Sequence, residues 1–141
     1  MGIFLQAQDT PFYVSMKGVI LLDDRVLLLR KPSGEWDIPG GRLSIEENPK
    51  QCLIREVLEE TGLTVKPGKL LHRWIRRRPN KIDVFLVSHI CKLADSTANT
   101  RLSSEHDKSG WFSLQESEAL YLPAGIHKSV QRAFRLQKKL K

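Results

Sequence analysis

The residues best suited to chemistry in this sequence are three glutamates, Glu56, Glu59 and Glu60, which lie close together in the chain. On a helix, Glu60 would lie about 40° from Glu56, and Glu59 about 60° away on its other side, so the three carboxylates share one face. The pair at positions i and i+4 costs about 0.2–0.5 kcal/mol of helix stability by repulsion. Carboxylates are ligands for hard cations such as Mg²⁺, and a bound cation would relieve this repulsion. The pattern indicates a metal site, with a solvated acidic helix face as the plain alternative.

The residues before these glutamates could complete such a site. Gly40 and Gly41 have no Cβ, so the backbone there can turn sharply and aim a carbonyl oxygen at a metal. Arg55 lies on the flank of the acidic face and can pair with Glu47, which would brace the intervening loop against the helix. The site therefore requires the loop to fold back over the helix.

A helix over residues 49–61 must position the glutamates. Asn48, Pro49 and Gln51 supply a capping side chain, a proline at the first helical position and a capping-box partner. Gly62 predicts a left-handed cap at the other end, and Pro67 prevents the helix from resuming. The same geometry predicts a core-facing stripe roughly opposite the acids, made of Leu53, Ile54, Val57 and Leu58.

The rest of the chain has the pattern of strands with one terminal helix. Apolar and β-branched runs predict two hairpins, one turning at Asp23-Asp24 and the other at Pro79-Asn80-Lys81. Apolar residues recur on one stripe from about Ile126 onward, which predicts an amphipathic, basic helix. These elements indicate an α/β fold with a mixed sheet. The predicted strands are 14–22, 25–30, 35–38, 70–78, 82–91 and 111–114, with 39–41 an irregular loop.

Length and composition exclude several classes of protein. The 141 residues, 40% hydrophobic and 28% charged, suit one globular domain over 1–141 and exclude disorder and coiled coil. The longest apolar runs, such as 26–29, are far shorter than the ~20 residues of a membrane span, and the first fifteen residues do not resemble a signal peptide. We therefore expect a cytoplasmic protein with no membrane partner.

The cysteines and the charge distribution add two expectations. Cys52 and Cys91 are too few for a disulfide framework and are predicted to be buried structural thiols. The net charge is +7, and residues 71–141 hold 14 Lys and Arg against 6 Asp and Glu. This basic half favours anionic partners, either small phosphorylated molecules or nucleic acid.

The segment from Gly41 to Leu63 resembles the Nudix box, G-x5-E-x7-R-E-U-x-E-E-x-G-U, in which U is aliphatic. Every fixed position is present, and Trp36-Asp37-Ile38-Pro39-Gly40 is similar to the segment that leads into the box. The resemblance implies the Nudix fold, a mixed sheet between helices. It also implies a Mg²⁺-dependent hydrolase, with Mn²⁺ as a second possible metal, that cleaves a nucleoside diphosphate linked to another group.

The same resemblance implies roles for individual residues. Glu56 and Glu60 would be metal ligands, Glu59 a ligand or the water-activating base, and Gly40 a source of a carbonyl ligand. Glu47 and Arg55 would form the supporting pair, and Glu105 would be a further ligand or base. For the substrate, the expected residues are Arg30, Arg42 and Arg76 on phosphate oxygens and Trp36 as a stacking partner for a base.

The substrate is less well specified than the chemistry. The compact length is similar to that of MutT-type members, which favours nucleoside triphosphates. Those that read oxidised guanine carry Asn after Pro-Ala, whereas this chain has Leu122-Pro123-Ala124-Gly125. Pro79 lies where ADP-ribose hydrolases tend to have proline, although it also suits a hairpin turn. The alternatives are an ADP-ribose or nucleotide-sugar pyrophosphatase, an RNA 5′-end enzyme or RNA binder, and a silent regulatory domain.

The partner expectations follow from the same residues. The Arg-rich segment near Pro79 and the basic terminal helix could track phosphates, but no interleaved aromatic platform accompanies them. We therefore expect a small nucleotide as substrate and no strong nucleic-acid binding, in a monomer or homodimer.

Overall fold

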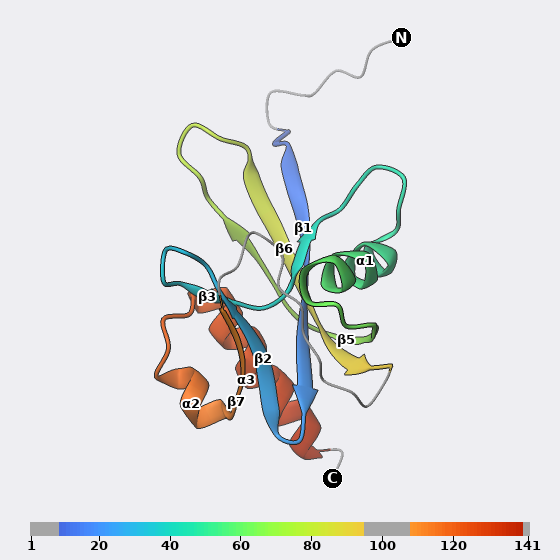
Figure 1. The fold of residues 1–141 in the computed structure, drawn as a ribbon. Coiled ribbons are helices and arrows are strands. Elements are labelled where there is room, and N and C mark those ends of the chain that lie inside the picture. The colour runs from blue at the N-terminus through green and yellow to red at the C-terminus, as the bar shows by residue number, and fades with distance from the viewer. Residues whose placement is uncertain (1–8, 95–107, 140–141) are drawn as a thin grey trace.

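The computed structural model describes residues 9–94 and 108–139 (Figure 1). Within these ranges, no helix is long and apolar enough to cross a membrane. Cys52 and Cys91 are both free and buried, as predicted. The elements are β1 (Phe12–Leu22), β2 (Arg25–Arg30), β3 (Trp36–Asp37), β4 (Gly40–Arg42), α1 (Pro49–Thr61), β5 (Val65–Arg76), β6 (Asp83–Leu93), β7 (Lys108–Phe112), α2 (Leu114–Glu118) and α3 (Ala124–Lys139).

The strands form one mixed sheet built around β1. The strand order is β3-β2-β1-β6-β5, with β4 also paired to β1 and β7 to β2. The β1–β6 pair is parallel and the other pairs are antiparallel. One edge of β1 pairs with β6. The other edge is divided between two strands: β4 pairs with Ser15–Lys17, and β2 pairs with Leu21–Leu22. The strands β4 and β2 therefore separate from each other beside the middle of β1.

Helix α1 begins and ends as predicted. The Asn48 side chain accepts a hydrogen bond from the Gln51 N–H, and the Gln51 side chain accepts one from the Asn48 N–H. Gly62 adopts a left-handed φ of 77°, and its N–H donates to the Leu58 carbonyl. These local contacts satisfy backbone groups at both helix ends, which explains why the sequence pattern is sufficient to place this element.

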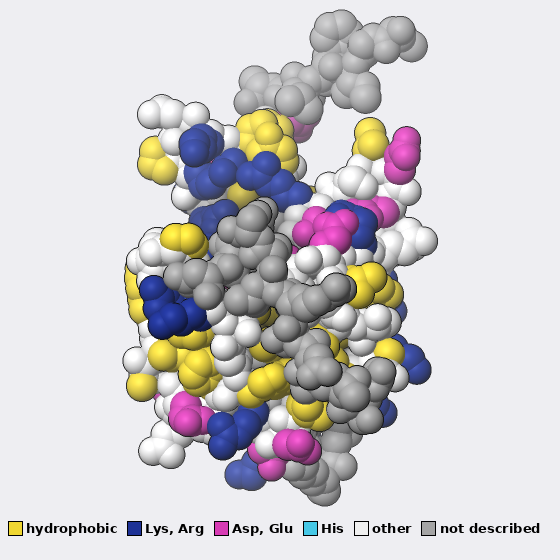
Figure 2. Space-filling model, in the orientation of Figure 1, with side chains coloured by type: hydrophobic (Ala, Val, Ile, Leu, Met, Phe, Trp, Pro, Cys, Tyr) yellow, Lys and Arg dark blue, Asp and Glu magenta, His cyan; other side chains and the backbone are white. Residues whose placement is uncertain are grey.

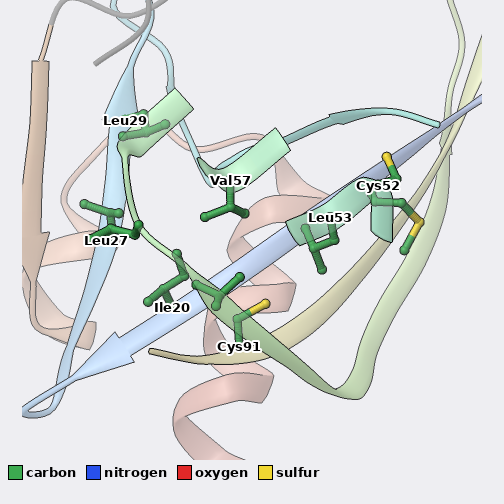
Figure 3. Close-up of a cluster of buried hydrophobic side chains, with 10 residues drawn as sticks. Ile20, Leu27, Leu29, Cys52, Leu53, Val57 and Cys91 are labelled. Atoms are coloured by element: carbon green, nitrogen blue, oxygen red, sulfur yellow. The ribbon is translucent and has the colours of Figure 1, made fainter. Parts of the chain in front are cut away.

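Two apolar cores lie on opposite faces of the sheet, one under α1 and the other under α3. Met16 and Ile20 of β1 join the core of α1, while Val19 joins that of α3, because side chains alternate along a strand. Figure 3 shows Leu53 and Val57 of α1 pointing toward β1. The expected arrangement of a mixed sheet between helices is therefore present.

The predicted core stripe of α1 is partly wrong. Leu53 and Val57 are buried, but Ile54 is only half-buried and Leu58 is 46% exposed. Glu60 is instead 5% exposed, so one of the three carboxylates is turned inward. The reason is tertiary: the end of α1 lies against β1 and β4, where a polar pocket accepts the carboxylate.

Several other boundaries differ from prediction because they depend on distant partners. Residues 40–42, expected as loop, pair with β1 as β4. Strand β5 begins at Val65 and passes through Pro67, which is tolerated because β5 is at the edge of the sheet and bulges there. The last strand ends at Phe112, since Ser113 and Glu116 form a capping box that starts α2. Helix α3 begins at Ala124 rather than at Ile126.

Candidate active site

The two glycines that precede α1 allow its carboxylates to approach the backbone. Gly40 has a φ of 149°, and a Cβ there would overlap the Met16 carbonyl oxygen. A Cβ on Gly41 would overlap the Glu56 carboxylate. The Gly40 N–H donates to Glu60 Oε1 at 2.8 Å, so the contact of Gly40 with the acidic helix is through its N–H. The absence of side chains thus brings β4 against both Glu56 and Glu60.

Arg55 connects the loop to the acidic face. Its Nε donates to Glu47 Oε2 at 2.9 Å, and its Nη2 donates to Glu47 Oε1 at 2.6 Å. Its Nη1 donates to Glu56 Oε1 at 2.8 Å and to Glu59 Oε2 at 3.2 Å. One guanidinium therefore offsets the repulsion among the carboxylates, and it makes the ion pair with Glu47 that the sequence suggests.

Two acidic side chains of this group have displaced pKa values. Hydrogen bonds from Arg55 and from the Ser44 N–H lower the pKa of Glu47 to about 2. Burial raises the pKa of Glu60 to about 7, and the negative charges of Asp37 and Glu56 act in the same direction. Lys17 and the Gly40 N–H oppose this shift, but burial is the largest effect. Glu60 is thus a carboxylate for which a nearby cation would replace a proton.

A buried ion network beside Glu60 was not predicted. Asp37 is 6% exposed, and its Oδ2 lies 3.0 Å from Lys17 Nζ and 3.4 Å from Lys31 Nζ. Burial opposes the charge of Asp37, but Lys17 and Lys31 outweigh it and lower the pKa of the carboxyl. Lone charged residues in otherwise apolar strand segments were the available sequence signal for this network.

These groups line one pocket with a volume of about 470 Å³. It combines carboxylates with cationic side chains and with the backbone of β4, and it lies where β2 and β4 separate from each other along β1. The acidic lining residues are Asp37, Glu56 and Glu60; the cationic ones are Lys17, Lys31, Arg42 and Arg76; the remainder are Ser15, Gly40, Gly41 and Leu86.

Of the residues predicted for the substrate, the structure brings Arg42 and Arg76 to the pocket and leaves two away from it. Trp36 packs edge-on against Phe112, with ring centroids 5.1 Å apart, in the core under α3. The edge-on contact with Phe112 is a structural role for the half-buried Trp36 ring, and stacking of Trp36 on a base stays a prediction. Arg30 ends β2 and is not among the described residues that line the pocket.

Of the remaining predicted residues, one lies at the margin of the site and one lies outside the residues that the structure describes. Glu59 is 57% exposed and faces Arg55. Glu105 lies outside the described residues. Within residues 9–94 and 108–139, no three acidic, His or Cys side chains are grouped as ready metal ligands. The contacts of Arg55 with Glu56 and Glu59 are consistent with this finding.

The glycine in the segment after α2 has a structural explanation. Gly125 lies in the first turn of α3, and a Cβ there would come within 2.6 Å of the Trp74 indole at Cδ2. The other surroundings of Trp74 include His72, whose ring stacks on it at 5.1 Å. The place that a side chain at position 125 would need is therefore filled by Trp74.

Comparison with known proteins identifies the family. The model of the NUDIX domain matches residues 14–133, which is most of the chain. The chain therefore belongs to the Nudix family.

The relatives include proteins named for different substrates. A MutT-like protein of Streptomyces ambofaciens is 40% identical over 68 residues, covering 46% of this chain and 44% of that protein. The mRNA-decapping enzyme subunit 2 of Arabidopsis thaliana is 45% identical over 64 residues, covering 43% of this chain and 17% of that protein. The chain spans less than half the length of curated relatives such as these.

Two solved structures match over nearly their whole length. The MutT protein of Methanosarcina mazei Go1 is 28% identical, with a TM-score of 0.75 over 94% of this chain and 99% of that one. An ADP-ribose pyrophosphatase of Streptococcus suis 89-1591 is 26% identical, with a TM-score of 0.68 over 92% of each chain.

Proposed function

We propose that this protein is a divalent-metal-dependent hydrolase that cleaves the pyrophosphate linkage of a nucleoside triphosphate. The observation that carries the proposal is the single pocket in which Glu56 and Glu60 face four cationic side chains. Carboxylates suit a hard cation, and Lys and Arg suit the oxygens of a phosphate chain. Family membership supports the same chemistry.

The donor set of the pocket fits Mg²⁺, or Mn²⁺ in its place. Glu56 and Glu60 provide hard oxygen ligands. The Gly40 N–H donates to Glu60 and helps to hold that carboxylate in place, while the Gly40 carbonyl stays an expected ligand. The high pKa of Glu60 also fits, since a buried carboxylate beside Asp37 and Glu56 gains from a cation. When bound, the metal supplies charge neutralisation for the pyrophosphate and acidifies a water molecule.

The side chains of the site would bind the phosphates, position the loop and accept a proton. Arg42 and Arg76 would hold phosphate oxygens, and Arg55 with Glu47 would keep the loop against α1. Glu59 is exposed at the edge of the acidic face, where it can accept a proton from water, and Glu105 is the second candidate for that role. The protein would thus position the phosphates and remove one proton, which is sufficient for an in-line attack by water.

Among substrates, a nucleoside triphosphate is favoured, and one with an ordinary base is favoured over one with an oxidised purine. The match over 99% of a MutT protein supports a nucleoside triphosphate as substrate. The packing of Trp74 against Gly125 argues against recognition of an oxidised purine, because position 125 has no side chain to recognise a base edge. ADP-ribose is the second candidate, favoured by the likeness to an ADP-ribose pyrophosphatase.

The experiment is a hydrolysis assay with Mg²⁺ or Mn²⁺ and a panel of substrates: nucleoside triphosphates, ADP-ribose, dinucleoside polyphosphates and 5′-triphosphate RNA. We expect the highest kcat/KM for a nucleoside triphosphate. Glu60→Gln should lower kcat by at least ~100-fold, equivalent to about 2.7 kcal/mol of transition-state stabilisation. Glu118→Gln, an exposed carboxylate on α2, is the matched control and should retain activity. Unchanged turnover in Glu60→Gln, or no hydrolysis of any substrate, would contradict the proposal.

A further inference from the structure

An arginine–tyrosine cluster, made of Tyr13, Arg42, Arg76 and Arg78, lies at the outer end of the pocket. The Arg42 guanidinium carbon is 3.9 Å from the centroid of the Tyr13 ring, and that of Arg78 is 5.7 Å from it. Both distances are in the range of cation–π attraction. Tyr13 remains 39% exposed, so the cluster is open to solvent.

The register of the sheet connects this cluster to the carboxylates. Tyr13, Ser15 and Lys17 alternate along β1 and so face the same side, and Ser15 and Lys17 line the pocket. Ser15 is paired with Arg42 on β4, while Tyr13 and Arg76 are both paired with Val84 of β6. Lys17 lies four positions along the strand from Tyr13, a distance of about 13 Å. The row of side chains therefore forms a floor that leads outward from the metal-binding end.

Two of the three arginines of the cluster have no ion-pair partner within the described parts of the chain. There, neither Arg42 nor Arg76 forms an ion pair with a carboxylate. The nearby Asp83 is already engaged, since its Oδ2 pairs with Arg77 at 2.9 Å and its Oδ1 accepts the Arg78 N–H at 2.8 Å. Figure 2 shows Lys and Arg side chains gathered over the upper ends of β1, β5 and β6, beside acidic side chains over α1. Like charges held this close would be stabilised by a bound polyanion.

The chemistry of the cluster selects the kind of anion. In Arg78 the Nε–H already donates to the Ile82 carbonyl oxygen at 2.8 Å. Stacking on the Tyr13 ring uses the flat face of a guanidinium and leaves the edge with its Nη N–H groups available for hydrogen bonds. That edge forms paired hydrogen bonds with phosphate oxygens. Several such groups in a row, beginning at Arg42 and Arg76 in the pocket, match a chain of phosphates better than one isolated phosphate.

We propose that the arginine–tyrosine cluster is an outer phosphate subsite, which binds the end of a triphosphate or longer phosphate chain whose inner phosphates lie at the carboxylates. This inference rests on the proposed function and deepens it, because it favours a polyphosphate-bearing nucleotide over a nucleoside diphosphate sugar. The cluster then contributes to substrate affinity and selection, not to the chemical step.

The binding test uses inorganic tripolyphosphate and pyrophosphate as probes, measured by calorimetry with Mg²⁺ at 0.15 M salt. We expect Arg78→Gln to weaken tripolyphosphate binding about 10-fold and pyrophosphate binding by less than about 3-fold. Arg42→Gln, which also removes a residue that lines the pocket, should weaken the binding of both probes. Tyr13→Leu should weaken tripolyphosphate binding as well, whereas Tyr13→Phe, which keeps the ring, should not. Lys81→Gln removes the same charge from the turn between β5 and β6 and is the matched control. Melting temperatures verify that each variant is folded.

The outcomes separate this inference from the proposed function. Failure of the wild type to hydrolyse any nucleotide would contradict the function, while the calorimetry would still report on the subsite. Equal losses of tripolyphosphate affinity in Arg78→Gln and Lys81→Gln would overturn the subsite. They would show that the probe responds to the overall positive charge of this region and not to specific contacts. Much tighter binding of 5′-triphosphate RNA than of tripolyphosphate, lost equally in Lys81→Gln, would also overturn it in favour of a nucleic-acid surface.

Discussion

Arg55 is the residue on which the acidic face of α1 depends when no cation is bound. It contacts Glu47, Glu56 and Glu59 at once, and it therefore holds the loop and offsets the repulsion on the helix. A metal would compete with Arg55 for Glu56 and Glu59. The same guanidinium thus stabilises the metal-free protein and limits its affinity for the cation.

This competition predicts two opposite effects of Arg55→Gln. The metal-free variant should melt several degrees lower than the wild type, because three carboxylates lose their shared partner. Millimolar Mg²⁺ should then raise its melting temperature by more than it raises that of the wild type, since Glu56 and Glu59 are released. Thermal melts with EDTA and with Mg²⁺ measure both effects. Identical Mg²⁺ responses in the two proteins would show that Arg55 and the metal do not compete.

Glu60 should make the stability of the metal-free protein depend on pH. Its pKa in the folded protein is raised to about 7 from an ordinary value of 4.5. The folded state therefore binds the proton more tightly, and the stability from this group is complete below about pH 4.5 and is lost as the pH rises through 7. Urea unfolding in EDTA should show that Glu60→Gln gains about 1–3 kcal/mol relative to the wild type between pH 5 and pH 8. A pH-independent difference would contradict this assignment.

At the scale of elements, β4 is the segment that positions the site, and its two glycines should fail differently. Gly40→Ala should destabilise the protein by about 2 kcal/mol or more, because its φ of 149° and the Met16 backbone both oppose a Cβ. Gly41→Ala should affect stability less, since the atoms it meets belong to the flexible end of Glu56. Its effect should be on turnover, through displacement of that carboxylate. Melting temperatures and kcat/KM of the two variants distinguish the cases, and equal stability losses would refute the distinction.

The elements that the sequence predicts well are those specified by neighbours in the chain. Helix α1 has its cap, its proline and its terminal glycine within the segment, and its bounds were predicted correctly. Strand β4 and the start of β5 depend on pairing with β1 and β6, which no local pattern encodes. The same reason explains the inward turn of Glu60 and the outward turn of Leu58.

The candidate site divides in the same way. The spacing of the box indicated the acidic residues and the Arg55–Glu47 pair, which lie within one segment of the chain. The Lys17–Asp37 pair joins residues 20 positions apart across two strands, and no local pattern in the sequence indicates it. Trp36 was assigned to the site by residue type alone, and its packing on Phe112 became visible only with the fold.

At the scale of the whole molecule, two groups of basic residues in the described part of the chain lie far apart. The turn between β5 and β6, with Arg77, Arg78 and Lys81, lies at the opposite end of the molecule from the basic C-terminal end of α3 (Figure 1). A nucleic-acid backbone would have to span both groups to gain from the full charge.

We therefore predict weak binding of single-stranded and duplex nucleic acid. At 0.15 M salt, affinity for RNA should be weaker than micromolar, and the salt slope should correspond to a few phosphate contacts only. Fluorescence anisotropy with labelled RNA over a range of salt concentrations measures both quantities. Submicromolar affinity at that salt would favour the RNA-end alternative.

The contact between Gly125 and Trp74 has a consequence for how the substrate preference of this protein can evolve. A side chain at position 125 requires the indole to move or shrink, and shrinking Trp74 alone leaves a cavity beneath α3. Each change is costly by itself and is compensated only by the other, so the two positions are epistatic. A lineage that acquires a base-reading side chain here must either pass through a destabilised intermediate or first gain stability elsewhere. Under the proposed function, the contact between Gly125 and Trp74 would thus oppose the gain of a base-reading side chain at position 125.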